Sequence, residues 1–267
     1  MNGASPQTWE PGAYLKFADL RLRPALDLLA HVALERAAQI TDLGCGAGNV
    51  TPFLHRRWPD GEITALDSSP EMLTRAKTEQ VYLDVTWQQT DVRQWAAPNS
   101  SHKQQDLIYS NAVLHWLDDH QKLFPRLMGK LNPGGVLAVQ MPSQFSEPSH
   151  VLMQQVARTG PWADVLTPLL RGTPVAEPDA YYDWLIPYCA SLDIWQTIYT
   201  QVLDGDHAVL NWISSTALKP LLEALDEAPR RAFKAALTDE LARAYPKRAD
   251  GKTLFAFRRL FIVAQKD

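Results

Sequence analysis

Residues 40–51 read Ile-Thr-Asp-Leu-Gly-Cys-Gly-Ala-Gly-Asn-Val-Thr, an apolar run that leads into glycines at alternate positions, Gly44, Gly46 and Gly48. This pattern predicts a strand that turns at once into a helix, where the backbone comes so close to a ligand that a Cβ would be in the way. A dinucleotide site of the Gly-x-Gly-x-x-Gly type needs a glycine where this chain has Asn49. The Gly-Lys-Ser/Thr of a phosphate-binding loop is absent as well.

Acidic residues follow three successive predicted strands. Asp42 heads the glycine motif, and a carboxylate there repels phosphate but suits a ligand that carries an ammonium and a sulfonium. Asp67 ends the apolar stretch 62–67 and lies nineteen positions after Gly48 (67 − 48 = 19), close to the ~20 expected of a carboxylate that binds ribose hydroxyls. Asp91 follows the next predicted strand. An aspartate after a strand is also a common helix N-cap, and this alternative stays open for Asp67 and Asp91.

The series resembles the cofactor motifs of class I S-adenosyl-L-methionine-dependent methyltransferases. The resemblance implies an α/β, Rossmann-like fold with a mostly parallel seven-stranded sheet and a helical cap inserted among the late strands. It also implies S-adenosyl-L-methionine as the cofactor, with Asp67 on the ribose and Asp91 on the adenine amino group. The implied cofactor-binding residues are Trp9, Tyr14, Arg23, Asp42, Gly44, Cys45, Gly46, Asn49, Asp67, Ser68, Met72, Asp91, Val92, Asn111 and Ala112.

The remaining chain supports an α/β architecture. Strands are predicted at 38–43, 62–67, 85–89, 106–110, 136–141, 194–203 and 253–264. Helices are predicted at 12–33, with a new start after Pro24, and at 49–58, 70–78 and 119–131. Residues 132–135 are predicted to form a turn. The stretches 147–190 and 206–247 are predicted to be helical with breaks. Alternation of strands and helices predicts a parallel sheet with helices on both faces.

These elements predict one methyltransferase domain over residues 1–267. Its expected parts are N-terminal helices over the cofactor (1–33), a cofactor-binding core (34–145), helical cap segments (146–192 and 204–250) and the last strands of the sheet (193–203 and 253–265).

The composition and charge of the chain indicate which classes of binding partner are compatible with it. The chain has 267 residues, 46% of them hydrophobic, and a formal net charge of −4. From Lys219 onward we count 11 basic and 7 acidic residues, a net +4 (11 − 7). This bias is compatible with a small anionic substrate, and it is too weak to indicate a nucleic-acid partner, which needs a clustered basic face.

Cysteine usage and the first residues indicate the compartment. The two cysteines, Cys45 and Cys189, form no disulfide framework and no zinc-binding spacing, so we expect no metal and a reducing, cytoplasmic environment. Residues 1–6 lack the charged and apolar regions of a signal peptide. No apolar stretch approaches the ~18 residues that a membrane helix needs.

Further motifs narrow the resemblance to the trans-aconitate 2-methyltransferase family, and they span the whole chain. They are Trp9-x-Pro11-x-x-Tyr14-x-x-Phe17, Arg21-x-Arg23-Pro24, Asp67-Ser68-Ser69-Pro70-x-Met72, Ser110-Asn111-Ala112, His115-Trp116, Val139-Gln140-Met141-Pro142, Glu147-Pro148-x-His150, Tyr181-Tyr182-Asp183, Asp193-Ile194-Trp195, Trp212 and Phe255-x-Phe257-x-Arg259-Leu260-Phe261. Two positions depart from the family pattern. Ala47 stands where proline is frequent, and Lys219 stands where arginine is frequent, although lysine lacks the bidentate geometry of a guanidinium.

The resemblance implies that the enzyme transfers a methyl group to a carboxylate of trans-aconitate or a related tricarboxylate and yields a monomethyl ester. We expect the enzyme to be a monomer. A carboxylate with a pKa near ~4 is already ionised at neutral pH, so we expect no general base and no catalytic residue in that sense. The other substrate carboxylates need cationic or hydroxyl partners. The implied substrate-binding residues are Arg259, Tyr181, Tyr182, His150, Trp195, Lys219 and Gln140.

Each substrate residue also has a structural alternative. Arg258 and Arg259 are neighbours on a predicted strand and point to opposite faces, so at most one enters the site, and we favour Arg259. Tyr181 and Tyr182 could be core aromatics, and His150 could be a packing or helix-capping residue.

Four other functions stay open. They are carboxyl methylation of another small molecule, methylation of malonyl-carrier protein, methylation of a quinone ring, and binding of S-adenosyl-L-methionine without catalysis. A nucleic-acid base methyltransferase is disfavoured, because residues 110–113 lack the Asn/Asp-Pro-Pro-Tyr that binds a flipped base.

Overall fold

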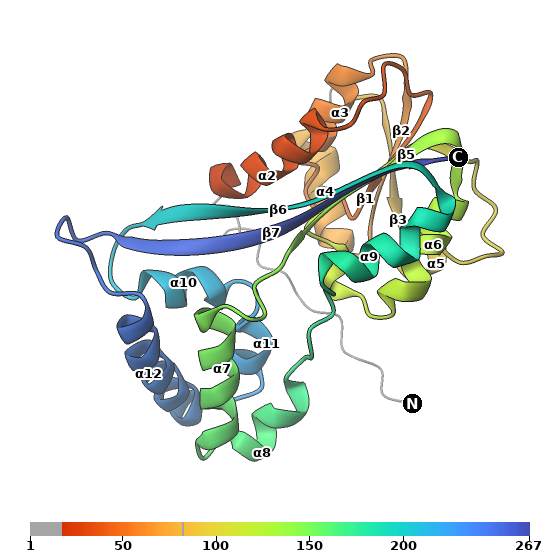
Figure 1. The fold of residues 1–267 in the computed structure, drawn as a ribbon. Helices are drawn as coiled ribbons and strands as arrows, with labels where there is room; N and C mark the ends of the chain where they lie inside the picture. Colours follow the sequence, from red (N-terminus) through yellow and green to blue (C-terminus); the bar gives the residue numbers. More distant parts are fainter. Residues whose placement is uncertain (1–17, 82) are drawn as a thin grey trace. The chain divides into compact units, whose positions relative to one another are not determined.

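The computed structural model describes residues 18–81 and 83–267, and this part of the chain divides into two compact units (Figure 1). The sheet unit comprises residues 19–142, 174–197 and 259–267. The helical unit comprises, among the described residues, Ala18, 143–173 and 198–258. The cap segments expected from the sequence are divided between the two units, since the end of the first one belongs to the sheet unit.

The described strands form one seven-stranded sheet in the order β3-β2-β1-β4-β5-β7-β6. Their bounds are β1 (Gln39–Leu43), β2 (Glu62–Asp67), β3 (Val85–Gln89), β4 (Gln105–Asn111), β5 (Leu131–Pro142), β6 (Cys189–Leu203) and β7 (Thr253–Lys266). The pairings among β1 to β5 are parallel, and β7 is antiparallel to β5. The strand order reverses between β1 and β4, and ligands of open α/β sheets bind at the carboxyl ends of the strands beside such a point.

Helices cover both faces of the sheet unit. They are α2 (Ala18–Ala30), α3 (Thr51–Arg57), α4 (Pro70–Glu79), α5 (Val92–Trp95), α6 (His120–Gly129) and α9 (Pro178–Leu185), with short 3₁₀ helices η1 (Leu114–Trp116) and η3 (Ile186–Tyr188). Figure 1 shows α2 and α3 on one side and α5, α6 and α9 on the other. The parallel sheet with helices on both faces is therefore present as predicted.

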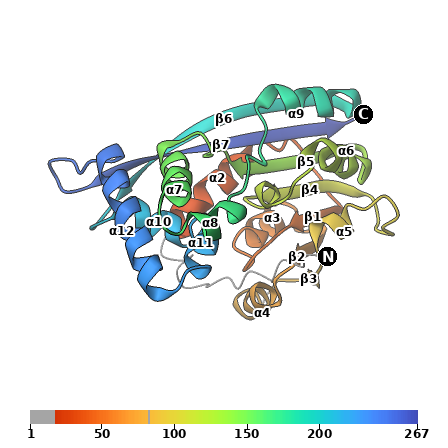
Figure 2. The same ribbon diagram turned by 90° about the horizontal axis from the view of Figure 1, so that it is seen from below.

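The helical unit has a hydrophobic core of its own. Its helices are α7 (Pro148–Thr159), α8 (Ala163–Leu166), η2 (Thr167–Leu169), α10 (Ala208–Ser214), α11 (Lys219–Glu223) and α12 (Glu227–Ala244) (Figures 1 and 2). Trp162 and Phe233 pack edge to face with centroids 5.2 Å apart, and the Trp162 indole donates to the Val156 carbonyl over 2.7 Å. These residues belong to a cluster of buried hydrophobic side chains that lies entirely within the helical unit, so this unit has a core of its own.

Several element boundaries differ from the prediction. β2 and β3 begin and end as predicted. β5 begins at Leu131 rather than 136, because the expected turn at 132–135 remains within the strand, with Gly134 at φ +75° and an irregular register against β4. α2 passes through Pro24 rather than restarting there, since it buries Ala25 and Leu28 completely and this burial offsets the lost hydrogen bond.

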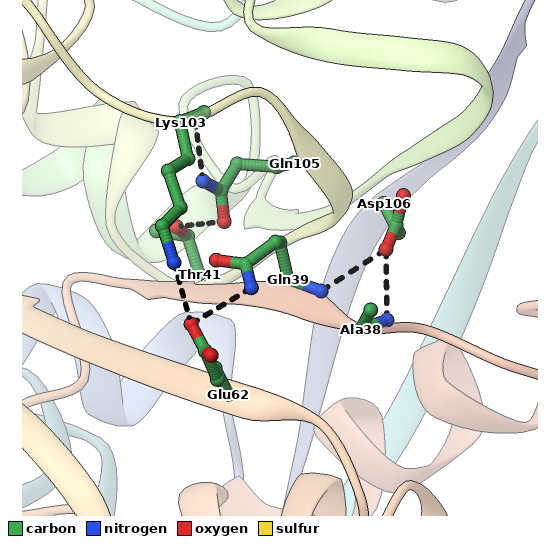
Figure 3. A network of polar contacts seen from close by, with 7 residues as sticks. All are labelled: Ala38, Gln39, Thr41, Glu62, Lys103, Gln105 and Asp106. Carbon is green, nitrogen blue, oxygen red and sulfur yellow. Dashed lines mark hydrogen bonds and ion pairs between the residues drawn. The ribbon is translucent and has the colours of Figure 1, made fainter.

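Polar contacts close the amino ends of β1, β2 and β4 (Figure 3). Asp106 accepts hydrogen bonds from the backbone amides of Ala38 (2.7 Å) and Gln39 (3.0 Å). The Glu62 carboxylate accepts hydrogen bonds from the side-chain amide of Gln39 (2.8 Å) and from the Lys103 ammonium (2.9 Å). This network fixes the starts of these three parallel strands, at the edge of the sheet opposite their carboxyl ends.

No helix among the residues that the structure describes has the length and apolar character to cross a membrane.

Candidate functional site

The glycine loop after β1 adopts a backbone that L side chains rarely take. Gly44, Gly46 and Gly48 have φ values of +77°, +56° and +76°. The amides of Gly44 and Cys45 both donate to the Leu66 carbonyl at the end of β2, over 2.7 and 2.9 Å. The loop is therefore anchored to the neighbouring strand, and glycine is required by the backbone conformation alone.

The absence of a side chain leaves space for neighbouring side chains at two of the three glycines and leaves open space at the third. A Cβ on Gly44 would lie 2.4 Å from Val113, and one on Gly48 would lie 2.8 Å from Trp87. A Cβ on Gly46 would meet nothing within 4 Å. The sequence predicted that all three keep space for a ligand. In the structure, two keep space for side chains of this chain, and only Gly46 borders open space.

Asp42 is a buried carboxyl group at the end of β1. It is 3% exposed and accepts a hydrogen bond of 2.6 Å from the Thr51 hydroxyl at the start of α3. Burial raises the pKa of Asp42 to about 7, the negative charge of Asp67 adds to this rise, and the bond from Thr51 opposes it. A cation beside Asp42 would favour its ionised form.

Asp67 connects the end of β2 to the glycine loop. Its Oδ2 accepts from the Gly46 amide and its Oδ1 from the Ser69 amide, each over 2.9 Å. Burial raises the pKa of Asp67, and these backbone bonds counteract part of that rise. Ser69, rather than Asp67, is the N-cap of α4 and accepts from the Met72 amide over 3.2 Å. Each Asp67 oxygen can accept a second hydrogen bond, as a ribose diol requires.

Asp91 takes the helix-capping alternative. It is the N-cap of α5, its Oδ1 accepts from the Arg93 amide over 2.7 Å, and its Oδ2 pairs with the Arg93 guanidinium at 3.2 Å. It also lies at the carboxyl end of β3, and Val92 beside it is buried. Its contact with an adenine amino group therefore stays a prediction.

The carboxyl end of β4 carries two unusual features. The Asn111 Oδ1 is buried and has no hydrogen-bond partner in the described part of the chain. Ala112 has φ +57°, which is unfavourable for a residue with a Cβ, and its amide donates to the Gln140 carbonyl over 2.8 Å. Orphaned polar atoms and strained backbone concentrate at functional sites, so this segment is a candidate site wall.

Arg259 and Gln140 form a buried pair on β7 and β5. Arg259 is 5% exposed, and its Nη1 donates to the Gln140 Oε1 over 3.3 Å. The Gln140 Nε2 is buried and has no hydrogen-bond partner among the residues that the structure describes. Gln140 stands opposite Asn111 in the β4–β5 register. The neighbouring Arg258 is instead paired with Glu147 at 3.1 Å in the helical unit.

The other predicted substrate residues of the sheet unit serve in packing or lie exposed. Tyr181 is fully buried, and its hydroxyl lies 2.6 Å from the His120 Nδ1, so its side chain has no surface for a solute. Tyr182 is 51% exposed. Trp195 stacks on Phe261 with centroids 4.7 Å apart. The packing alternative therefore applies to Tyr181, and Trp195 is an aromatic packing residue as well.

His150 and Lys219 belong to the helical unit. Burial lowers the pKa of His150 to about 4, so the ring is neutral at physiological pH, and its Nδ1 lies 3.3 Å from the Ser149 hydroxyl. Lys219 pairs with Glu223 at 3.6 Å on α11. Both positions stay predictions as substrate contacts.

The remaining predicted cofactor residues have varied surroundings. Cys45 is partly buried, and burial together with the charges of Asp42 and Asp67 raises the pKa of its thiol. Arg23 is exposed on α2 and lies 3.9 Å from Asp27. Asn49 is partly buried, Ser68 is exposed, Met72 is buried, and Trp9 and Tyr14 lie outside the described residues. No group of three or more His, Cys, Asp or Glu within 18–81 and 83–267 could hold a metal ion.

Sequence reasoning missed two contributors to this site. Thr51 shares a hydrogen bond with Asp42, and its only signal is a hydroxyl residue at the start of the helix after the loop. Val113 packs against Gly44 from sixty-nine positions away (113 − 44 = 69), and no local pattern indicates such a contact.

Comparison with known proteins agrees with this geometry. Residues 40–135 match the family described as "Methyltransferase domain". The trans-aconitate 2-methyltransferase of Azoarcus sp. (strain BH72) is 48% identical over 257 residues, which cover 96% of this chain and 98% of the relative. That of Methylobacterium radiotolerans is 45% identical over 97% of this chain and 98% of the relative.

Solved structures of low identity share the fold. The YcgJ protein of Bacillus subtilis aligns with a TM-score of 0.57 at 14% identity and covers 91% of this chain and 97% of its own. Phosphoethanolamine N-methyltransferase 2 of Haemonchus contortus aligns with a TM-score of 0.53 at 14% identity and covers 92% of this chain and 53% of its own. The predicted α/β class with a mostly parallel sheet is confirmed.

Proposed function

This chain belongs to the trans-aconitate 2-methyltransferase family, and we propose that it transfers the methyl group of S-adenosyl-L-methionine to a carboxylate of trans-aconitate, which gives a monomethyl ester. The observation that carries the proposal is the high identity over nearly the whole length of both chains. The intact glycine loop with open space at Gly46 is consistent with it.

The residues at the carboxyl ends of the strands fit S-adenosyl-L-methionine. Gly46 borders a space that a Cβ would fill, and the buried Asn111 Oδ1 offers an unused acceptor. Asp67 would hold the ribose diol, and Asp42 supplies negative charge beside the glycine loop. When bound, the cofactor supplies a methyl group already activated on a sulfonium. The residues of this chain then need to bind the cofactor and the substrate, orient the substrate carboxylate toward the methyl group and exclude water.

We propose that no protein group acts as a general base. The reacting carboxylate of the substrate is ionised well below neutral pH, with a reference pKa near ~4, and needs no deprotonation. Alignment of the carboxylate oxygen with the methyl group is therefore the main contribution, and proximity and orientation supply up to roughly 7–11 kcal/mol in favourable cases.

A non-reacting carboxylate of the substrate is assigned to Arg259 and Gln140. A buried carboxylate must be paired, and a guanidinium pairs it with two parallel hydrogen bonds. Arg259 is a buried cation, and the unused Gln140 Nε2 beside it is a further donor for a carboxylate oxygen. A tight ion pair on the reacting carboxylate would reduce the nucleophilicity of that carboxylate. Arg259 and Gln140 therefore bind another carboxylate of the substrate.

The finer features of the proposal are a small tricarboxylate as the sole partner, a monomeric state and a cytoplasmic location. The net charge of −4, which disfavours nucleic acid, supports the first feature, and free Cys45 and Cys189, which suit a reducing compartment, support the third. Light scattering of the purified chain tests the monomeric state, and a dimer would contradict it.

A methyltransferase assay against a panel of acids tests the reaction. The panel contains trans-aconitate, cis-aconitate, isocitrate and malonyl-carrier protein, and mass spectrometry detects the ester. We expect a monomethyl ester from trans-aconitate and none when Asp67→Ala replaces the wild type at a cofactor concentration near its Kd. Ester only on the carrier protein, or cofactor binding without any ester, would replace this function by one of the alternatives.

A further inference from the structure

A buried histidine and a buried tyrosine are hydrogen-bonded to each other in the sheet unit. His120 opens α6 and is 3% exposed, and Tyr181 lies on α9 and is fully buried. The His120 Nδ1 is 2.6 Å from the Tyr181 hydroxyl, and the His120 Nε2 is 2.9 Å from the Leu114 carbonyl. Phe124 contacts both rings, with centroids 5.3 and 4.9 Å away. The imidazole therefore connects α9 to the short helix η1.

The partners determine where the protons are. The Leu114 carbonyl can only accept, so the His120 Nε2 carries a proton and donates it. The Tyr181 hydroxyl oxygen accepts from the Ala176 amide over 3.3 Å, which leaves its own proton for the unprotonated Nδ1 of His120. A neutral imidazole thus satisfies both ring nitrogens.

Leu114 belongs to the segment that begins at the last residue of β4. This segment, Asn111–Trp116, is held at one end by the bond from the Ala112 amide to the Gln140 carbonyl (2.8 Å). At the other end it is held by His120. Between the two bonds the backbone passes through the positive φ of Ala112, an arrangement that persists only where the surroundings enforce it.

The segment is in contact with the glycine loop. Val113 lies so close to Gly44 that a Cβ there would be 2.4 Å from it, and the Asn111 Oδ1 is the unused buried acceptor. The position of Leu114 thus bears on Val113, which borders the glycine loop, and on the Asn111 acceptor of the same segment.

We propose that His120 and Tyr181 are positioning residues that hold Asn111–Trp116 in the arrangement that cofactor binding and methyl transfer require. His120 acts through its bond to Leu114, and Tyr181 acts through His120. The inference rests on the proposed function for the reaction that it serves, while the bonds themselves lie within the sheet unit and are testable without the substrate.

Two variants of His120 separate its two bonds. In His120→Asn the amide end takes the place of Nδ1, which keeps the partner Tyr181 and loses Leu114. In His120→Gln the amide nitrogen reaches the place of Nε2, which keeps Leu114. We expect His120→Asn to lower kcat roughly 10- to 100-fold, as small misplacements near reacting groups do, with a much smaller change in the KM for trans-aconitate, and His120→Gln to recover most of the loss.

Two further readouts do not depend on the methyl acceptor. Calorimetry with S-adenosylhomocysteine should show weaker binding for His120→Asn than for His120→Gln. Hydrogen exchange should be faster at residues 112–116 in His120→Asn, with the strands β4 and β5 unchanged. These results would hold even if the panel assay assigned another substrate. Failure of the positioning role of His120 and Tyr181 can therefore be told apart from failure of the proposed function.

Tyr181→Phe removes one hydroxyl and keeps the ring, and Tyr245→Phe is its matched control. The Tyr245 hydroxyl also accepts from a backbone amide, that of Ser149 over 3.0 Å, but in the helical unit. Faster exchange at 112–116 is expected only for Tyr181→Phe. The proposal is overturned if His120→Asn and His120→Gln lower the melting temperature equally and leave kcat, S-adenosylhomocysteine affinity and segment exchange at wild-type values.

Discussion

At the scale of single residues, Gly46 is the position where a side chain would enter open space at the site. In Gly46→Val we expect loss of measurable S-adenosylhomocysteine binding by calorimetry, because the branched side chain occupies the space of the cofactor. Gly251→Val is the matched control, since Gly251 has φ +78° and open space in the helical unit. Both variants carry backbone strain, and only the first should lose the cofactor. Retained affinity in Gly46→Val would move the site elsewhere.

Asp42 should couple cofactor binding to pH. Its pKa is raised to about 7 in the cofactor-free protein, so half of the molecules carry a neutral Asp42 near that pH. A cationic cofactor favours the ionised form, and binding below about pH 7 must therefore release a proton. We expect affinity for S-adenosyl-L-methionine to fall as pH drops from 7 to 5 by up to about tenfold per unit. Calorimetry in buffers of different ionisation enthalpy measures the proton, and Asp42→Asn should abolish its release. An unchanged affinity across this range would contradict the coupling.

Arg259 and Arg258 offer a comparison of neighbouring guanidinium groups. Arg259→Ala should cost roughly 2–4 kcal/mol in kcat/KM for trans-aconitate, with cofactor affinity unchanged, because a substrate carboxylate loses its buried cation. Arg259→Lys should recover only part, since the fork geometry is lost. Arg258→Ala is the control: this side chain is paired with Glu147 and 36% exposed, so its loss should change kcat/KM by less than about twofold. If Arg259→Ala also stays within that range, Lys219 becomes the next candidate.

At the scale of elements, the amino ends of the strands affect stability rather than chemistry. Asp106→Ala removes the acceptor of the Ala38 and Gln39 amides and of the Asn132 side chain, and should lower the free energy of unfolding by about 1–3 kcal/mol. Burial alone would raise the pKa of Asp106, but these hydrogen bonds lower it overall. The stabilisation is thus complete above pH 3.8, the ordinary pKa of the carboxyl group, and is lost as pH falls below it. Denaturant titrations measure the effect, and a fall in kcat at 25 °C without a loss of stability would contradict this assignment.

The sequence predicted best those elements whose signals are local. β2 has a largely apolar centre and β3 opens with the strand-forming residues Val85, Thr86 and Trp87. Asp67 and Gly46 follow from spacing along one strand–turn–helix unit. The start of β5 was missed because Leu131 already pairs with Gln105 before the Pro-Gly-Gly stretch, which forms an irregularity inside the strand instead of a turn ahead of it. The positioning pair His120 and Tyr181 joins residues sixty-one positions apart, so only the folded chain shows it.

At the scale of the whole molecule, each unit has a core that can be weakened separately. Phe233→Ala in the helical unit and Phe124→Ala in the sheet unit each empty a fully buried position and should cost about 3–5 kcal/mol. In scanning calorimetry we expect each variant to lower mainly the transition of its own unit, and S-adenosylhomocysteine to raise the transition of the sheet unit. One shared transition, lowered equally by both variants and raised as a whole by S-adenosylhomocysteine, would mean that the units unfold together.

The place of β7 has a consequence for synthesis on the ribosome. β6 precedes β7 in the chain, yet β7 is the strand that lies between β6 and β5. Sixty-three residues separate the end of β6 from the end of β7 (266 − 203), which is roughly 3 to 13 s of translation at ~5–20 residues per second. During that interval β6, with its apolar Ile198 and Val202, has no strand to join. The nascent chain therefore passes through a stage in which β6 lacks its neighbouring strand, and slower codons after β6 would lengthen that stage.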